Sequence, residues 1–248
     1  TPVSMRLGHL RLVKPERLWR YRTVSEIQDK AVSRYLAAKA DSSLTPPNPT
    51  IISWESKPVY TCGRREIGTV SEEAQKALRM NGEADFEEAL RGGQTTFHGP
   101  GQLVAYPIID LRRHKISPRD YVCLLEKSVI DTCAEFGVSA MTTDNTGVWT
   151  SPEDKICAVG LHMRRNITSH GIGLNVTTNL WWFNRIVACG LPGTRTTSLG
   201  QQTLGPVSVD DVAHAFVDNF AKRLGIDGVD QMDNEDEYMN YISSSVEK

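Results

Sequence analysis

The chain has 248 residues, 40% of them hydrophobic, and its 28 Lys and Arg against 30 Asp and Glu give a formal net charge of −2. This balance excludes a general attraction to nucleic acid, and no window approaches the roughly 18 consecutive apolar residues of a membrane helix. We therefore expect a globular protein with no nucleic-acid partner and no membrane partner.

Periodic apolar patterns predict both helices and strands. Helical spacing predicts helices over Val24–Lys39, Glu72–Met80, Pro118–Phe136 and Val209–Leu224. Ser117 and Ser208 are the predicted caps of the last two. Runs of β-branched and apolar residues predict strands over Thr50–Trp54, Val59–Cys62, Gln102–Asp110, Thr146–Thr150, Lys155–Met163 and Gly171–Thr177. Because the strands cluster between well-separated helices, the order favours an α+β fold in which helices pack on mixed β-sheets.

No repeat and no long low-complexity linker divides the chain. The stretch from Ala40 to Thr50 contains three prolines and predicts a surface loop, because proline cannot continue a helix or a central strand. Acidic and polar residues dominate the last part of the chain. We predict a single domain over residues 1–225 and an acidic C-terminal tail over residues 226–248.

The densest unusual segment is a glycine-rich loop that begins at Arg91. It reads Arg91-Gly92-Gly93-Gln94-Thr95-Thr96-Phe97-His98 and continues as Gly-Pro-Gly to residue 101. Such a loop lets its backbone come close to a ligand and direct N–H groups at a carboxylate, phosphate or oxyanion. It lacks the Gly-Lys-Ser/Thr of a nucleotide P-loop and the spacing of a dinucleotide fingerprint. A structural hairpin is the alternative, but Arg91, Gln94 and His98 favour a binding site.

Lys155 opens an apolar strand, in which alternation puts it on the same side as Cys157 and Val159. A lysine in such a position is often an edge residue whose amine extends to water. His162 and His170 follow on the chain and offer a rival Cys/His arrangement, although a lone histidine is more often structural than catalytic.

Cys189 is the cysteine best placed for chemistry. Gly190, Pro192 and Gly193 follow it, which predicts a turn, whereas Cys133 lies on the apolar stripe of a helix. A thiol attacks as the thiolate, and a neighbouring ammonium lowers its pKa from the usual value of about 8.5. We hypothesise that Cys189 is a nucleophile and that Lys155 is its cation. The other cysteines receive no catalytic role, and the scattered set of five predicts reduced thiols and no metal site.

Three segments, in this order, resemble the lipoyl(octanoyl) transferases, the enzymes that start protein lipoylation: RGGQTTFHGPGQLVAYP, KICAVGLHMRRNITSHGIGLNV and FNRIVACGL. The resemblance extends from about Leu7 to the helix that ends near Leu224. It implies the fold of biotin- and lipoate-protein ligases, an acyl tunnel between glycine loops, and no cofactor. It also implies octanoyl-acyl-carrier protein as donor, and as acceptors the lysines of lipoyl domains in 2-oxoacid dehydrogenase complexes and of the glycine cleavage H protein.

The same resemblance implies the site residues. The nucleophilic cysteine of the family falls on Cys189, and the lysine that lowers its pKa falls on Lys155. The first substrate-binding stretch falls on Arg91–His98, and two further stretches fall on Ala158, Val159, Gly160 and on Gly171, Ile172, Gly173.

Several positions depart from the common family residues. Trp181-Trp182 and Val187-Ala188 differ from frequent bacterial residues, and Gly173 replaces a usual alanine. The proline-rich insertion and the acidic tail resemble a eukaryotic, mitochondrial member, whereas a bacterial member would be cytoplasmic.

Two other functions stay open. An ATP-dependent lipoate- or biotin-protein ligase of the same fold would need the lysine and a means of recognising an adenylate, but no nucleophilic cysteine. A non-catalytic protein that binds lipoyl domains would keep the loops as a docking surface and form no acyl-enzyme. A cysteine on a turn favours the transferase over both.

Overall fold

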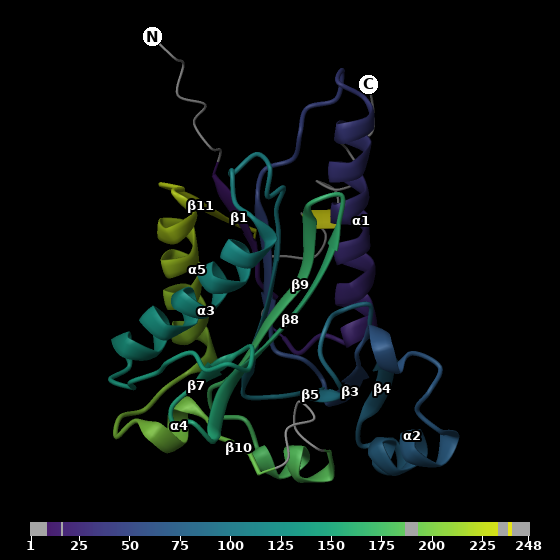
Figure 1. Ribbon diagram of the computed structural model, residues 1–248, viewed down its shortest axis with the longest axis vertical. Coiled ribbons are helices and arrows are strands. Elements are labelled where there is room, and N and C mark those ends of the chain that lie inside the picture. Colours follow the sequence, from purple (N-terminus) through teal and green to yellow (C-terminus); the bar gives the residue numbers. More distant parts are fainter. Residues whose placement is uncertain (1–8, 16, 187–192, 233–237, 240–248) are drawn as a thin grey trace.

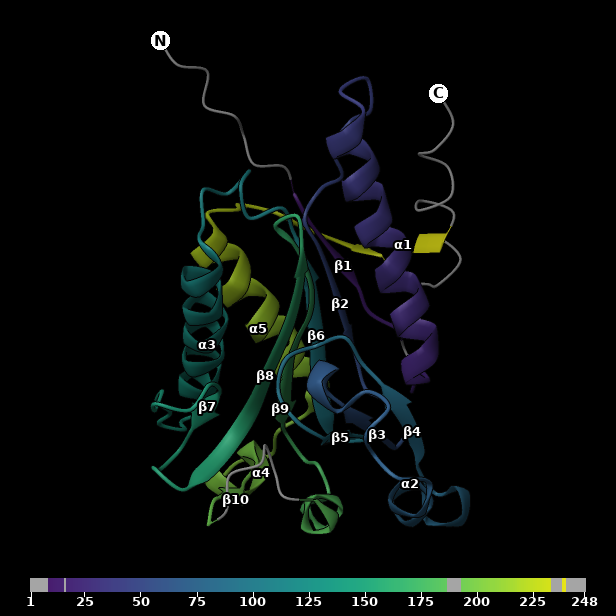
Figure 2. The same ribbon diagram turned by 45° about the vertical axis from the view of Figure 1, so that its right-hand side comes forward.

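A computed structural model gives the arrangement of residues 9–15, 17–186, 193–232 and 238–239. Its centre is a mixed sheet with the strand order β10-β8-β9-β6-β2-β1-β11, and β7 pairs with β8 beside this path. A smaller sheet has the order β4-β3-β5. Helices α3 and α5 cover one face of the large sheet and α1 covers the other (Figures 1 and 2). The predicted α+β architecture with mixed sheets is confirmed.

The described elements have the following bounds. The strands of the large sheet are β1 (Leu10–Val13), β2 (Thr50–Trp54), β6 (Gln102–Ile108), β7 (Val148–Trp149), β8 (Asp154–Arg164), β9 (Ile167–Asn175), β10 (Arg195–Thr196) and β11 (Val229–Met232). Those of the small sheet are β3 (Val59–Cys62), β4 (Asp85–Glu88) and β5 (Thr96–His98). The α-helices are α1 (Tyr21–Ala40), α2 (Glu72–Arg79), α3 (Pro118–Glu135), α4 (Leu199–Gln202) and α5 (Val209–Leu224). Three 3-10 turns are η1 (Arg64–Glu66), η2 (Met80–Gly82) and η3 (Leu180–Arg185).

Local sequence signals account for most helix boundaries. Ser117 Oγ accepts a hydrogen bond from Asp120 N at 3.1 Å, and Ser208 Oγ accepts one from Asp211 N at 3.1 Å, so both predicted caps are confirmed. Helix α1 begins at Tyr21 rather than at the predicted Val24, because the buried Tyr21 side chain extends the apolar stripe.

The two faces of the large sheet bury separate hydrophobic clusters. On one face, Val129 of α3 and Phe216 of α5 pack in the cluster that contains Leu174 of β9. On the other face, Ile27 of α1 belongs to the cluster that contains Tyr106 of β6. Full burial of one large apolar side chain contributes about 1.5–3 kcal/mol, so these two layers hold the sheet between the helices.

The predicted strands omit the short strands β1, β4, β5, β10 and β11, and β9 differs in its bounds. β9 extends from Ile167 to Asn175 and not from Gly171 to Thr177, so Gly171 lies in the middle of the strand. β11 pairs in parallel with β1, so the sheet continues into the residues predicted as the tail after residue 225. The sequence Val-Asp-Gln-Met is too short and too polar to show a strand period, and the edge of β1 provides its hydrogen-bonding partner.

Candidate active site

One face of the β8–β9 pair carries a strip of residues with almost no side chain. Ala158 lies opposite Gly173 and Gly160 lies opposite Gly171. These four positions share one face because side chains alternate along a strand, while the intervening Val159 packs towards α3 and α5. The missing side chains leave room for a narrow cavity on the face of the sheet away from α3 and α5.

The glycine-rich loop closes this cavity, which we call the slot. The slot is lined by Arg91, Gly92, Gly93, Gln94, Thr96, His98, Tyr106, Ala158, Val159, Gly160, Gly171, Ile172 and Gly173. Three predicted binding stretches therefore meet around one cavity. Thr95 and Phe97 do not line it: Thr95 Oγ1 donates to Glu66 Oε2 at 3.1 Å, and the buried Phe97 ring stacks on Trp182 at 4.9 Å.

Arg91 shapes the loop. Its side chain is 5% exposed, and a guanidinium has five N–H donors. Nε and Nη2 donate to Thr61 Oγ1 at 3.2 and 2.7 Å, and Nη2 also donates to Thr61 O at 2.6 Å. Nη1 donates to Gly92 O and Gln94 O, both at 3.0 Å. All five donors are used inside the protein, so Arg91 contributes its charge to the slot but not a hydrogen bond to a ligand.

A chain of buried amides orients His98. Its Nδ1 lies 2.7 Å from Gln102 Oε1, and Gln102 Nε2 donates to Asn175 Oδ1 at 2.9 Å. Asn175 Nδ2 donates to Thr197 O at 3.0 Å, which defines both amide orientations and requires His98 to donate from Nδ1. Burial, with the charge of Arg91 as the second cause, lowers the pKa of His98 to about 4, so near pH 7 the ring is neutral and Nε2 is an acceptor.

Neutral polar side chains gather at the Tyr106 end of the slot. The Tyr106 ring packs edge-on against His170 at 5.1 Å, and Tyr21 stacks on His98 at 6.3 Å. Burial raises the pKa of Tyr106 well above its usual value and lowers that of His170 to about 3. Neither His170 nor His162 lines the cavity that contains Lys155, which disfavours the rival Cys/His arrangement.

Lys155 lies towards the other end of the slot, at the start of β8. It lines a second cavity with Asn175, Phe183 and Thr196, and this Lys155 cavity shares Thr96, Ala158 and Gly173 with the slot. Lys155 is 9% exposed, and its Nζ donates to Thr146 O at 2.9 Å and lies 5.1 Å from the centre of the Trp149 ring. The amine is therefore held inside the site and does not extend to water as an edge lysine would.

The backbone beside Lys155 admits its side chain only because residue 147 is glycine. Gly147 has a φ of 128°, and a Cβ atom there would lie 2.4 Å from Lys155 Cε. Gly147 N donates to Glu126 Oε1, on α3, at 2.9 Å. Neither residue is predicted from the sequence, because one glycine before a strand and one carboxylate on a helix give no functional pattern.

Cys189, the predicted nucleophile, lies outside the described residues. Described residues before and after it, Phe183 and Thr196, line the Lys155 cavity. β10 pairs in parallel with β8 so that Thr196 lies opposite Lys155, and Thr197 N donates to Lys155 O at 2.9 Å. The chain on either side of the predicted nucleophile therefore leads to the buried lysine.

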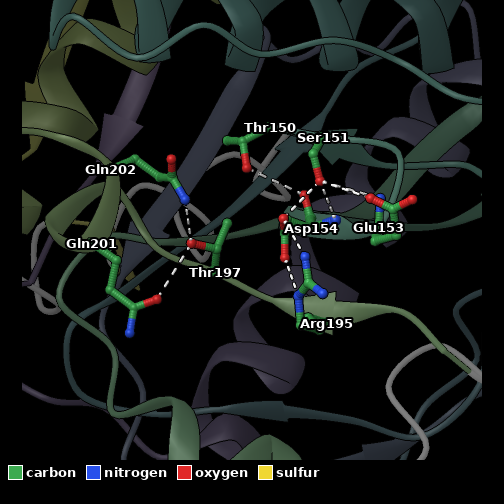
Figure 3. Close-up of polar contacts among 8 residues, drawn as sticks. All are labelled: Thr150, Ser151, Glu153, Asp154, Arg195, Thr197, Gln201 and Gln202. Carbon is green, nitrogen blue, oxygen red and sulfur yellow. Dashed lines mark hydrogen bonds and ion pairs between the residues drawn. The ribbon is translucent and has the colours of Figure 1, made fainter.

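Polar contacts fasten β10 to the start of β8 (Figure 3). Arg195 Nε and Nη2 donate to the two carboxylate oxygens of Asp154 at 2.7 and 2.9 Å, and Ser151 Oγ donates to Asp154 Oδ2 at 2.7 Å. These hydrogen bonds lower the pKa of Asp154 and keep it ionised, and those from Arg195 have the largest effect. Gln202 Nε2 donates to Thr197 Oγ1 at 2.9 Å on the other side of β10. The contacts hold the strand next to Lys155 in register.

The described cysteines are unsuited to nucleophilic attack in this site. Cys133 and Cys157 are buried in the core, and burial raises the pKa of Cys133 to about 12 and that of Cys157 well above its usual value. Burial also raises the pKa of Cys62, and Cys123 is exposed on α3 outside the slot.

The described residues contain no cluster of three or more His, Cys, Asp or Glu side chains that could hold a metal ion. Within the same part of the chain, none of the helices has the length and hydrophobicity to cross a bilayer. A cavity of about 640 Å³, larger than the slot, lies between β1, β2 and the start of α5 and contains the Lys14–Asp210 ion pair, but it includes none of the predicted site residues.

Known proteins resemble this chain over most of its length. The family described as lipoyl protein ligase A/B catalytic domain matches residues 28–221. A Schizosaccharomyces pombe protein named "Probable octanoyltransferase" is 50% identical over 192 residues, which cover 77% of this chain and 85% of that protein. A Danio rerio protein named "Octanoyl-[acyl-carrier-protein]:protein N-octanoyltransferase LIPT2, mitochondrial" is 42% identical over 204 residues, which cover 82% of this chain and 88% of that protein.

Solved structures share the fold. A bi-partite lipoate protein ligase from Thermoplasma acidophilum has a TM-score of 0.68 at 16% identity, over 97% of this chain and 92% of that chain. Biotin protein ligase from Aquifex aeolicus, in complex with biotin and ATP, has a TM-score of 0.51 at 12% identity, over 88% of this chain and 71% of that chain. At these identities the likeness concerns the fold alone, and it confirms the ligase-like fold that the sequence resemblance implies.

Proposed function

Because this chain belongs to the lipoyl protein ligase A/B catalytic domain family, we propose that it transfers an octanoyl group from octanoyl-acyl-carrier protein to a lysine of a protein acceptor, the first step of protein lipoylation. The observation that carries this function is the slot over the small residues of β8 and β9, which shares Thr96, Ala158 and Gly173 with the cavity that Lys155 lines. The octanoyltransferase names of relatives at 50% and 42% identity support it.

The slot suits a medium-length acyl chain. The step from Lys155 to Gly160 along β8 covers roughly 16 Å, at about 3.3 Å per residue. Seven C–C bonds of about 1.5 Å give an octanoyl chain an upper length of roughly 10 Å. An acyl carbonyl beside Lys155 therefore leaves the methyl end inside the slot. Each buried methylene contributes about 0.8 kcal/mol, which favours a chain that fills the slot without exceeding it.

The nucleophile we propose is Cys189, because the chain on both sides of it leads to the Lys155 cavity. Its thiolate attacks the carbonyl of the donor thioester, and the C–S bond to the carrier breaks as the new thioester forms. The Lys155 ammonium stabilises the attacking thiolate and then gives a proton to the leaving carrier thiolate. N–H groups of the glycine-rich loop stabilise the tetrahedral oxyanion, at about 3 kcal/mol for each well-placed donor.

The acceptor lysine then attacks the Cys189 thioester as a neutral amine. The amide bond forms, the C–S bond to Cys189 breaks, and the thiolate is restored. Lys155, neutral after the first step, accepts the proton that the amine loses. Both steps balance without ATP because the donor thioester is already activated.

The acceptors that we propose are the lipoyl domains of 2-oxoacid dehydrogenase complexes and the glycine cleavage H protein. The proposed location is the mitochondrion, in agreement with the name of the Danio rerio relative.

Intact-mass spectrometry tests the first half-reaction. After incubation with octanoyl-carrier protein, we expect one octanoyl group on the chain, removable by neutral hydroxylamine and absent from Cys189→Ser. Cys123→Ser removes an exposed cysteine on α3 and is the matched control, which should be acylated like the wild type. Acylation of Cys189→Ser at the wild-type rate would refute the nucleophile.

Alkylation by iodoacetamide as a function of pH tests the role of Lys155. We expect Lys155→Ala to move the alkylation midpoint of Cys189 to higher pH, because the thiolate loses its neighbouring cation. An unchanged midpoint would assign Lys155 to another step.

Two further assays separate the alternatives. Octanoylation of an acceptor from free octanoate that requires ATP and survives Cys189→Ser would establish a ligase instead. Binding of a lipoyl domain without acyl-enzyme formation from any thioester would establish a non-catalytic binding protein.

A further inference from the structure

A groove that borders the slot at Gly92, Gly93 and Gly160 also reaches Lys155. Its lining includes Lys155, Asn145, Thr146 and, further along, Arg65. An adjoining hollow shares Arg65 and the two loop glycines, Gly92 and Gly93, and adds Arg64, Arg91 and His162. We call the two together the arginine groove, which extends from the buried amine to the 3-10 turn η1.

The arginine groove is positive throughout. Arg64, Arg65, Arg91 and Lys155 line it and no carboxylate does, although the whole chain has a net charge of −2. An anion in this groove therefore meets several cations and no fixed negative charge among the lining residues.

Glu66 belongs to η1 but does not line the groove. Glu66 Oε2 accepts hydrogen bonds from Gly63 N at 3.3 Å and from Thr95 Oγ1 at 3.1 Å, which fixes η1 against the glycine-rich loop. Burial raises the pKa of Asp29 and lowers the pKa of His162. Arg64 N donates to Arg91 O at 2.9 Å, so the backbone of η1 is held close to the slot.

Arg64 and Arg65 are the cations available to a ligand. Both side chains are exposed, and neither makes a hydrogen bond or an ion pair with another described residue. By contrast, the donors of Arg91 are all used by the loop and by Thr61 of β3, and Lys155 donates to Thr146 O.

We propose that Arg64 and Arg65 bind the phosphodiester of the phosphopantetheine arm on which the carrier presents the octanoyl thioester, an assignment that rests on the proposed function. With the acyl chain in the slot and the carbonyl at Lys155, the thioester sulfur and its arm leave by another route, and the arginine groove begins at Lys155. A guanidinium presents paired N–H donors that match two phosphate oxygens. The exposed Asn145 also lines the groove, and the arm carries its amides between the thioester and the phosphate. Asn145 is therefore placed to contact those amides.

Binding of the arm alone tests the assignment without any chemistry. By calorimetry, we expect the wild type to bind phosphopantetheine about tenfold more tightly than pantetheine, the ratio for one charge-assisted contact. The double variant Arg64→Ala/Arg65→Ala should bind the two equally. Arg112→Ala/Arg119→Ala removes the same charge from exposed arginines outside the groove and should keep the tenfold ratio. Equal binding of both compounds by the wild type would overturn the assignment.

Acyl-enzyme formation from octanoyl-phosphopantetheine and octanoyl-pantetheine gives the second readout. The Arg64→Ala/Arg65→Ala variant should slow acylation by the phosphorylated donor about tenfold and leave the other donor and the transfer to an acceptor unchanged. Equal loss with both donors, or loss only in transfer to the acceptor, would reject the phosphate contact and indicate an acidic acceptor surface in its place. Selective phosphopantetheine binding without acyl-enzyme from any thioester would keep the phosphate site and refute the proposed function.

Discussion

The space for the Lys155 side chain depends on Gly147. A Cβ atom at this position would lie 2.4 Å from Lys155 Cε and 3.0 Å from Nζ, and the φ of 128° is strained for any residue with a side chain. We expect Gly147→Ala to displace the amine and to slow acyl-enzyme formation by tenfold or more at a cost of about 1–3 kcal/mol in stability. Quenched time courses of acylation measure the rate of acyl-enzyme formation, and thermal unfolding measures the loss of stability. Gly205→Ala, with no atom within 4 Å of its Cβ, is the control, and wild-type acylation by Gly147→Ala would contradict the argument.

The buried histidines make the free energy of unfolding depend on pH in the mildly acidic range. Burial lowers the pKa of His98 to about 4 and that of His170 to about 3, against about 6.5 in an unfolded chain. Between these pKa values the unfolded chain binds the protons and the folded chain does not. The contribution of these histidines to stability is therefore fully present above about pH 6.5 and falls as the pH drops towards 4. Urea unfolding should show a loss of at most about 2 kcal/mol per histidine between pH 7 and pH 5.

His170→Asn tests the origin of that slope. His170 has a φ of 56°, and asparagine tolerates this left-handed conformation better than most residues. The variant should fold and lose part of the pH dependence, since burial also lowers the pKa of His98 and of His114 to about 4 and lowers that of His162. A slope equal to that of the wild type would assign the pH dependence to other groups.

At the scale of the element, the pairing of β8 with β9 creates the slot. A Cβ atom at Gly173 would lie 3.3 Å from both His98 Cε1 and Gln102 Oε1, so a larger side chain there fills the cavity. We expect Gly173→Val to reduce octanoyl transfer by about tenfold or more and to retain transfer of butanoyl, because each methylene excluded costs about 0.8 kcal/mol, a factor of about four. Acylation rates across a series of thioesters measure this. The octanoyl acylation rate of Gly173→Ala should lie between those of Gly173→Val and the wild type. An unchanged order of rates across chain lengths would place the acyl chain elsewhere.

At the scale of the whole molecule, the C-terminal strand closes one edge of the large sheet. β11 pairs with β1, and Met232 and Tyr238 belong to the hydrophobic cluster under α1, with Tyr238 only 1% exposed. Removing residues 226–248 should lower the melting temperature by several degrees, at about 2–4 °C per kcal/mol for a chain of this size. Removing residues 240–248 keeps every described contact and is the control. An unchanged melting temperature after the longer deletion would support residues 1–225 as an independent domain, as the sequence predicts.

The sequence by itself determined the features that depend on neighbouring residues. Helix α5 shows its serine cap, its apolar stripe and its terminal glycine within one short stretch, and its predicted bounds match those observed. The glycine-rich loop and the proposed nucleophile Cys189 are predicted in the same way, from local composition and from the order of three segments that resemble one family. Local steric and hydrogen-bonding preferences act over a few residues, so a sequence displays them directly.

Only the tertiary structure decided how these features meet. Arg91, Ala158 and Gly171 surround one slot because β8 pairs with β9 and the loop packs over both, and no periodic pattern in the sequence encodes those pairings. It also decided that Arg91 uses its donors to tie the loop to Thr61 of β3, that Gly147 makes room for Lys155, and that β11 joins the sheet. The physical reason is common to all of these: a contact between distant segments depends on which surfaces are buried together, and that is determined by the folded chain as a whole.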